Sequence, residues 1–224
     1  MKEKYEVKKL IIVGAGGMGR KLYECVRKLN CKNKRWEIIG FIDDNLNTLQ
    51  GKKCDLEIIG TIKEWTPKKS EVFVMGISDP YLKKKLSNQI KEKGGEFETI
   101  ISPDVILGDY VNIGEGSVIM TPYNVESGAK IGRFVTLLGS TIALDGEIGD
   151  YSTTTGFVNL TNSKLGSEVF VGSHAVILEN VNVGDRAVIC VGSIVMQDVE
   201  SDTKVIGYPA RTIEKMNRRF YNGK

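Results

Sequence analysis

The sequence of 224 residues has little net charge, few cysteines and no long apolar run. No apolar segment approaches the roughly 18 residues of a membrane-spanning helix, which argues against a membrane protein. The formal net charge of +3 is small and spread through lysine-rich segments, so it gives no reason to expect a nucleic-acid partner. The lysine-rich start, Met1–Lys9, is followed by too short an apolar stretch for a signal peptide, and we therefore expect a cytoplasmic protein.

The cysteines give no sign of a metal centre. Cys25, Cys31, Cys54 and Cys190 form no Cys-x-x-Cys pair and show no metal-ligand spacing, so we expect no bound metal. Three of them fall where helix or strand is expected, which favours buried thiols in a reducing compartment.

The second half of the chain has a six-residue repeat. Aliphatic residues recur six apart in two registers, Ile113, Ile119, Val125, Ile131 and Leu137, then Leu165, Val171, Ile177, Val183, Ile189 and Val195. A helix repeats near 3.6 residues and a simple strand near two, so neither explains the period. Stacked triangular coils do explain it, because each short side buries one aliphatic residue, and the repeat predicts a parallel β-helix. The intervals Ile131–Ile148 and Ile148–Leu165 span 17 residues instead of 18, which predicts a tightened corner or a displaced loop in each.

Residues 8–101 follow a different pattern. Strands are expected at 10–13, 37–42, 71–76 and 97–101, with helices near 20–29 and from about 79 to 93. Alternating strands and helices imply a parallel sheet, so we expect a short Rossmann-like α/β domain over 1–101. An all-β domain over 102–212 and a basic, partly helical tail over 213–224 follow it. The lysines at 83–85, 91 and 93 are interpreted as a solvated helix face, with a ligand-binding patch as the alternative.

A Gly-x-Gly-x-x-Gly string from Gly14 to Gly19 stands between the first strand and the first helix. There, glycines let a phosphate approach the backbone at a helix N-terminus. Asp43 and Asp44 end the second strand, where a carboxylate can hydrogen-bond a ribose or a sugar amine. The alternative is that the glycines make only a tight turn and the aspartates cap a loop. The segment is about half a dinucleotide fold, which favours a site for one nucleotide over an NAD dehydrogenase.

The hexapeptide coils end in Ile206-Gly207-x-Pro209-Ala210-Arg211, which resembles the left-handed β-helix acyltransferases. The strings Val13-Gly14-Ala15-Gly16-Gly17-x-Gly19-Arg20 and Phe41-Ile42-Asp43-Asp44 narrow this resemblance to one branch. That branch comprises the sialic acid O-acetyltransferases and the bacterial nucleotide-amino-sugar N-acetyltransferases of surface-glycan synthesis. The resemblance covers about residues 8–212. It implies a left-handed β-helix, a homotrimer, acetyl-CoA in the groove between neighbouring β-helices, and a nucleotide sugar against the N-terminal domain.

The resemblance also suggests binding residues. The candidates for the nucleotide sugar are Gly14, Gly16, Gly17, Asp43 and Asp44. The candidates for CoA are backbone groups around Gly156, Gly172 and Gly192, together with Arg211. Phe134, Tyr151 and Phe157 fall near corners, where aromatic side chains mark either an interface between chains or a stacking ladder within one chain.

The chain departs from this branch at the catalytic histidine. Members carry a His followed by an acidic residue in a mid-helix coil, whereas the matching stretch 141–148 is one residue short and has Leu144 or a neighbour there. The second habitual histidine, in the glycine loop, is Met18. The remaining candidates to accept a proton are Asp145, Glu147 and the single histidine, His174. The carboxylates have an alternative role as turn residues, and His174 as a CoA contact or a solvated corner residue.

The leading hypothesis is transfer of an acetyl or other acyl group from acyl-CoA to the amino group of a nucleotide-linked sugar. An amine acceptor needs less general-base help than a hydroxyl, so the missing histidine favours N-acylation. One alternative is O-acetylation of a sialic-acid-like sugar through His174 or a carboxylate. Another is a catalytically lapsed trimer that binds a nucleotide sugar. CoA binding with turnover separates the enzymes from the last alternative, and the acceptor atom separates the two enzymes.

Overall fold

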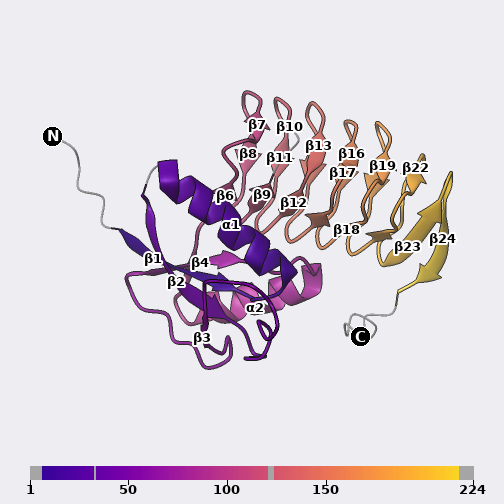
Figure 1. Ribbon diagram of the computed structural model, residues 1–224. Coiled ribbons are helices and arrows are strands. Elements are labelled where there is room, and N and C mark those ends of the chain that lie inside the picture. The colour runs from indigo at the N-terminus through magenta and orange to yellow at the C-terminus, as the bar shows by residue number, and fades with distance from the viewer. Residues whose placement is uncertain (1–6, 33, 121–123, 217–224) are drawn as a thin grey trace.

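A computed structural model describes residues 7–32, 34–120 and 124–216 (Figure 1). An α/β domain lies at one end, and a β-helix extends away from it. The expected fold class, a short parallel sheet with helices followed by a parallel β-helix, is confirmed.

The N-terminal sheet has five parallel strands in the order β3-β2-β1-β4-β5. They are β1 (Lys8–Val13), β2 (Trp36–Ile42), β3 (Ile58–Gly60), β4 (Glu71–Met75) and β5 (Glu96–Phe97). β3 was not expected, because it is three residues long and half exposed and so presents no buried apolar run. The expected strand 97–101 is divided: β5 pairs with β4, whereas β6 (Ile100–Ile101) pairs with β9 (Val118–Met120) of the β-helix.

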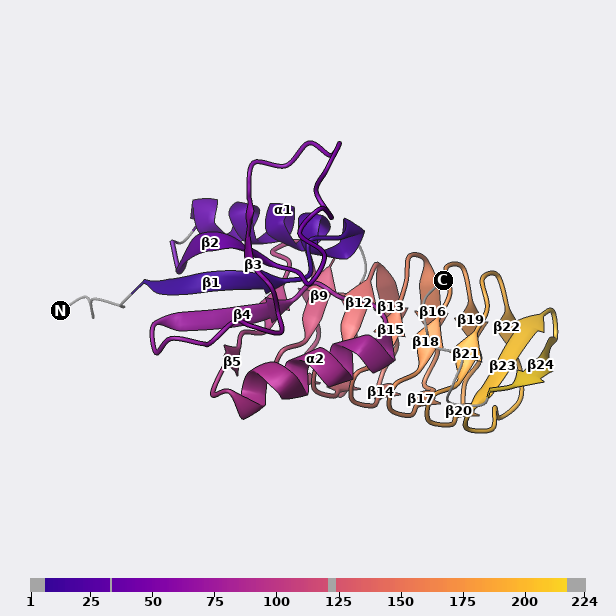
Figure 2. The ribbon, with the colours of Figure 1, turned by 90° about the horizontal axis from the view of Figure 1, so that it is seen from below.

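Two helices cover the two faces of this sheet (Figure 2). α1 (Gly17–Lys32) begins within the glycine string and is longer than predicted. α2 (Pro80–Glu92) begins where it was expected, because the Asp79 side chain accepts the Leu82 N–H at 2.7 Å and Pro80 occupies the first turn. Successive residues of each strand point to opposite faces, so the sheet contributes to two cores, one under each helix.

The β-helix is built from three sheets whose neighbouring strands come from successive coils. Sheet one contains β6, β9, β12 (Thr136–Leu138), β15 (Thr153–Thr154), β18 (Phe170–Val171), β21 (Val188–Ile189), β23 (Thr203–Gly207) and β24 (Ala210–Lys215). Sheet two contains β7 (Ile106–Leu107), β10 (Asn124–Val125), β13 (Ser140–Ile142), β16 (Val158–Leu160), β19 (Val176–Ile177) and β22 (Ile194–Val195). Sheet three contains β8 (Asn112–Ile113), β11 (Lys130–Ile131), β14 (Glu147–Ile148), β17 (Lys164–Leu165) and β20 (Asn182–Val183).

The six-residue period is the spacing of the corners between these sheets. Most of the described corners have a residue with positive φ, between +36° and +83°, and these corners stack into three edges. The first edge, between sheets three and one, contains Gly116, Phe134, Tyr151, Glu168, Arg186 and Asp202. The second edge, between sheets one and two, contains Gly139, Phe157, His174 and Gly192. The third edge, between sheets two and three, contains Tyr110, Gly128, Asp145, Asn162 and Asn180.

The two shortened coils are explained by these edges. The steps from Phe134 to Gly139 and from Phe157 to Asn162 have five residues instead of six. Ile131 therefore pairs with Ile148 after 17 residues and still faces the interior. The stretch 141–148 has the full six-residue side from Gly139 to Asp145, so the expected deletion lies before it rather than within it.

The helix α2 docks the α/β domain along the first edge. The rings of Phe134 and Tyr151 stack with centroids 5.3 Å apart and an interplanar angle of 4°, and both are buried. Lys91 Nζ lies 2.6 Å from Glu115 Oε2, and Lys84 Nζ lies 2.6 Å from Glu168 Oε1. Of the two alternatives, stacking within one chain holds for Phe134 and Tyr151, which belong to an intramolecular interface, and contact between chains does not. Phe157 of the second edge is 59% exposed.

Two further expectations are corrected. The lysines of α2 do not form a simple solvated face, because Lys83 is completely buried and Lys84 and Lys91 pair with the β-helix. The segment after the coils is not helical up to Lys215: β24 pairs antiparallel with β23, and residues 217–224 lie outside the described part of the chain.

The thiols are less buried than expected. All four cysteines are free, and only Cys25 is buried. Burial raises the pKa of the Cys25 thiol, with a hydrogen bond from Ser102 acting in the opposite direction. Cys31 is exposed, and Cys54 and Cys190 are partly exposed. The prediction of buried thiols therefore holds only for Cys25.

Candidate functional site

A cavity of about 780 Å³ opens at the carboxyl end of the N-terminal sheet. All five residues predicted to bind the nucleotide sugar line it, namely Gly14, Gly16, Gly17, Asp43 and Asp44. Ligands commonly bind at this end of a parallel α/β sheet, because the loops after the strands converge there. The structure thus brings together residues that are up to 30 positions apart in the sequence.

The glycine string forms one wall of the cavity. Gly14 has φ +90°, and a Cβ there would lie 2.8 Å from Ile77 Cγ1, so this position requires glycine. A Cβ at Gly19 would collide with the Gly14 carbonyl, which lets α1 start close to β1. By contrast, Cβ atoms at Gly16 and Gly17 would meet nothing within 4 Å. The space there and the positive end of α1, which has no acidic residue in its first turn, suit a phosphate group.

The two aspartates hold loops as well as lining the cavity. Asp43 Oδ2 accepts the Ala15 N–H at 2.8 Å, and its Oδ1 accepts the Asn45 N–H at 2.9 Å. Asp44 Oδ1 accepts the Lys63 N–H at 3.0 Å. The loop-capping role that the sequence left open is therefore present. Asp43 Oδ1 also accepts the Thr48 hydroxyl at 3.2 Å, whereas Asp43 Oδ2 and the Asp44 oxygens each accept no more than one of these bonds and can still contact a ligand.

The rest of the cavity lining consists of residues that the sequence analysis did not assign to a site. They are Ile62, Lys63, Gly76, Ile77, Ser78, Asp79, Leu82, Lys85, Leu86 and Gln89, joined by Met18 of the glycine string. Lys63 and Lys85 are exposed cations at the cavity. The positions 82, 85, 86 and 89 share one face of α2, and this helical spacing was the available signal.

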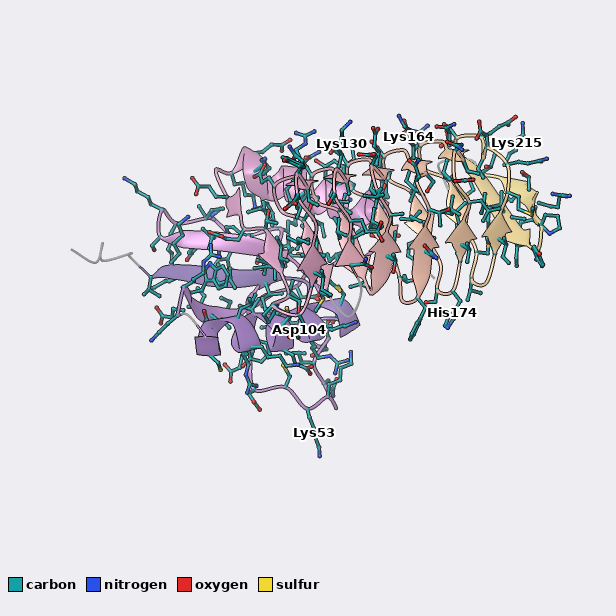
Figure 3. All side chains as sticks on the ribbon, turned by 90° about the horizontal axis from the view of Figure 1, so that it is seen from above. Lys53, Asp104, Lys130, Lys164, His174 and Lys215 are labelled. Atoms are coloured by element: carbon teal, nitrogen blue, oxygen red, sulfur yellow. The ribbon has the colours of Figure 1, made fainter. Side chains whose placement is uncertain are left out.

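Of the three candidate catalytic residues, His174 lies apart from the two carboxylates. Asp145 is on the third edge, Glu147 is on the outer face of sheet three, and His174 is on the second edge. Figure 3 shows His174 on the opposite side of the β-helix from Lys130 and Lys164, which flank Glu147. No acid–base pair among these three exists within one chain.

The charges around Glu147 do not favour a general-base role for its carboxylate. Its Oε1 lies 3.1 Å from Lys130 Nζ and 3.5 Å from Lys164 Nζ. The hydrogen bond from Lys130 lowers the pKa of the Glu147 carboxyl, which makes it a weaker proton acceptor.

Leu144, which stands at or next to the position where the resemblance leads one to expect a histidine, faces solvent. Leu144 is 56% exposed on the third edge, and its N–H donates to Glu126 Oε2 at 3.1 Å. Leu144 is therefore not a core residue of the β-helix. Asp145 beside it has φ +56°, the conformation of a corner residue.

The glycines proposed for CoA cluster on the second edge. His174 N–H donates to Gly156 O at 3.0 Å, and Gly192 N–H donates to Ser173 O at 2.8 Å, so three coils are joined there. Cβ atoms at Gly156 and Gly192 would meet no atom closer than 3.7 Å, whereas one at Gly172 would lie 2.6 Å from Val191 N. Gly172 is thus required by the stacking of coils, and the other two leave open surface. Arg211 is exposed on β24, opposite Ile206 of β23.

Comparisons with known proteins agree with this architecture. Residues 9–90 match the PglD N-terminal domain family. The GDP-perosamine N-acetyltransferase of Escherichia coli O157:H7 is 30% identical over 186 residues, which are 76% of this chain and 78% of that protein. The chain therefore belongs to the acetyl-CoA-dependent sugar acetyltransferases that join a PglD-like domain to a hexapeptide β-helix.

Two solved structures share the fold. The acetyltransferase domain of PglB from Neisseria gonorrhoeae FA1090 superposes with a TM-score of 0.84 at 22% identity, covering 92% of this chain and 100% of that one. PerB from Caulobacter crescentus, in complex with CoA and GDP-perosamine, superposes with a TM-score of 0.80 at 19% identity, covering 93% and 99%. The chain spans about half the length of some other relatives: the serine acetyltransferase of Synechococcus elongatus is matched over 47% of its length at 30% identity. None of the described helices is long and apolar enough to cross a bilayer.

Proposed function

We propose that this chain transfers the acetyl group of acetyl-CoA to the amino group of a nucleotide-linked sugar, in cytoplasmic synthesis of a surface glycan. The observation that carries the proposal is the cavity, which combines an open glycine loop, the N-terminus of α1 and two lysines. This combination suits a phosphate-bearing ligand. The family membership supplies the reaction class.

The cavity suggests how the acceptor binds. A diphosphate would lie over Gly16 and Gly17, within reach of Lys63 and Lys85. Apolar Ile62, Ile77 and Leu82 offer contact to the flat face of a base or a sugar ring. Gly14 lines the cavity and also shapes the loop, because its φ of +90° is used for the turn.

The second edge is the proposed donor site. The open glycines Gly156 and Gly192 let the pantetheine chain lie against backbone groups, and Arg211 provides a cation for a CoA phosphate. The cavity and the second edge belong to different parts of the chain. A trimer, which the resemblance implies, would complete the reaction site by bringing the second edge of one copy near the acceptor bound to another.

The chemistry does not require the family histidine when the acceptor is an amine. The free-base amine attacks the thioester carbonyl carbon, the carbon–sulfur bond breaks, and CoA leaves as a thiolate. The proton lost by the amine passes to this thiolate or to water, and backbone N–H groups stabilise the tetrahedral oxyanion. A hydroxyl acceptor would lose about 10²–10⁴-fold without a general base, so O-acetylation is the weaker candidate.

The test is CoA release from acetyl-CoA by the purified protein with a panel of nucleotide-linked 3-amino and 4-amino sugars. Release with one amino sugar, and none with its hydroxyl counterpart, is the expected result. Release with a sialic-acid-like hydroxyl acceptor would replace N-acetylation by O-acetylation. No release across the panel, together with nucleotide-sugar binding and no CoA binding by calorimetry, would indicate a binding protein that has lost the chemistry.

A further inference from the structure

Lys83 is a charged side chain with no exposed surface, enclosed between α2 and sheet one. Its Nζ donates to Thr136 Oγ1 at 2.9 Å, to Thr153 Oγ1 at 2.8 Å and to Ser152 O at 3.2 Å. An ammonium group has three donors and no acceptor, so these three oxygens match it completely. All three belong to the β-helix, in or next to β12 and β15.

The interaction continues to the cavity. Thr153 Oγ1 donates its single proton to Ser78 O at 2.6 Å, and it therefore accepts from Lys83. Ser78 lines the cavity, as do Leu82 and Lys85, which flank Lys83 on α2. The start of α2 thus faces the cavity on one side and is hydrogen-bonded to the β-helix on the other.

The cost of this arrangement argues that it has a role. Burial lowers the pKa of Lys83 well below its usual value, and the nearby Asp79 opposes this shift only in part. Ile100 and Val118, on the outward face of the same sheet, are apolar and belong to the buried core that includes residues of α1. If docking were the only role, an apolar residue at position 83 packed against valines at positions 136 and 153 would serve it without the desolvation of a charged group. The lysine and the two threonines add directional hydrogen bonds to the contact.

We propose that Lys83 is the positioning residue that fixes the α2 wall of the cavity to β12 and β15, and so sets where a bound sugar lies relative to the β-helix. The consequence for transfer rests on the proposed function. Lys83 is a positioning residue rather than a catalytic one, because its side chain is fully enclosed and its three donors are used by the β-helix. It acts through Thr153 and Ser78.

Lys83→Met tests this role, because it keeps the length of the side chain and removes its donors. We expect nucleotide-sugar affinity, measured by calorimetry without acyl donor, to change by less than about threefold while kcat falls about 10- to 100-fold, since misplaced reactants lose rate rather than affinity. Lys84→Met is the matched control, because it also removes a lysine contact between α2 and the β-helix, but from a lysine that is 44% exposed and does not bond Thr153, and it should keep kcat within about threefold. A kcat for Lys83→Met equal to that of Lys84→Met would overturn the proposal.

Thr153 provides a second pair of variants should Lys83→Met fail to fold. Thr153→Val removes the bridging hydroxyl, and Thr153→Ser retains it. The valine variant should reproduce the loss of kcat and the serine variant should restore it, with the Lys83→Met/Thr153→Val double variant no worse than the poorer single one. Equal activities of the valine and serine variants would contradict the role of the bridge.

Amide hydrogen exchange gives a readout that does not depend on turnover. Lys83→Met and Thr153→Val should speed amide exchange in residues 76–92 and leave exchange in the coils from β18 to β22 unchanged. Lys84→Met and Thr153→Ser should leave exchange unchanged in both regions. If the wild-type protein acetylates no amino sugar, the proposed function fails, and this exchange pattern alone decides whether Lys83 fixes the cavity wall. Unchanged exchange over 76–92 in both Lys83→Met and Thr153→Val would refute it.

Discussion

The imidazole ring of His174 stacks on the ring of Phe157, with centroids 4.8 Å apart and an interplanar angle of 23°. The pair lies on the second edge, between the open surfaces at Gly156 and Gly192. Neither Asp145 nor Glu147 is beside it, so no carboxylate from this candidate set orients the imidazole. This arrangement favours His174 as part of the wall of the donor site over His174 as a general base.

His174→Ala should therefore retain N-acetylation. Loss of a general base would reduce kcat about 10²–10⁴-fold, whereas loss of a stacked wall residue should mainly raise the KM for acetyl-CoA, with kcat within about threefold. His174→Phe keeps an aromatic ring over Phe157 and should restore the KM. A kcat loss of a hundredfold or more in both variants would show instead that His174 accepts the proton.

Glu147→Gln should affect stability slightly and transfer not at all. The pKa of Glu147 is lowered in the folded protein, so its contribution is present above the ordinary carboxyl pKa and is lost as the pH falls through the lowered value. The pair is partly exposed and screened by water, so the loss at pH 7 should be only about 0.5 kcal/mol of unfolding free energy. Urea unfolding of both proteins at pH 7 and below about pH 3 measures this: the difference should shrink at the acidic pH. A difference that grows on acidification, or a hundredfold fall in turnover at pH 7, would contradict this account.

Gly16→Ala and Gly19→Ala should separate ligand binding from folding. Around Gly16 there is open space, so the alanine variant should unfold within about 1 kcal/mol of wild type, yet bind a nucleotide sugar roughly tenfold less tightly because the methyl group keeps a phosphate from the backbone. At Gly19 the methyl group would collide with the Gly14 carbonyl, so this variant should lose stability as well as binding. Thermal unfolding and calorimetry measure the two effects. Wild-type affinity in Gly16→Ala would place the phosphate elsewhere.

The elements with a strong hydrophobic period could be predicted from the sequence. The elements that depend on pairing between distant segments could not. Ile131 and Ile148 could be placed on one interior column because the hexapeptide period alone defines the coil. β3 and the division of residues 97–101 depend on which neighbour a two- or three-residue strand finds, and no local pattern encodes that. Lys83 was assigned to water for a similar reason: its neighbours in sequence are lysines, and its buried partners, Thr136 and Thr153, are more than fifty residues away.

The candidate site divides in the same way. Gly14, Gly16 and Asp43 were recognisable because their types and spacing follow from a strand–turn–helix context. Lys63 and Lys85 were not, because they come from a loop and a helix that only the folded sheet brings to the cavity. Phe134 and Tyr151 were recognised as corner aromatics. The hexapeptide repeat places a residue at a corner, but it does not show which other part of the protein packs against that corner.

Phe134 and Tyr151 offer a last test, of the interface between the two parts of the chain. Phe134 is 1% exposed and contacts Phe97 edge-on, with centroids 4.9 Å apart, so Phe134→Ala should cost about 3–5 kcal/mol of unfolding free energy and loosen the α/β domain. Tyr151→Phe keeps the stacked ring and removes only a long hydrogen bond of 3.4 Å to Asn88 Oδ1, so it should cost less than about 1 kcal/mol. Denaturant unfolding gives both values, and size-exclusion chromatography of Phe134→Ala should show the same assembly as wild type, because this aromatic pair is buried within one chain. A loss of assembly in Phe134→Ala at unchanged stability would mean that the pair acts between chains after all.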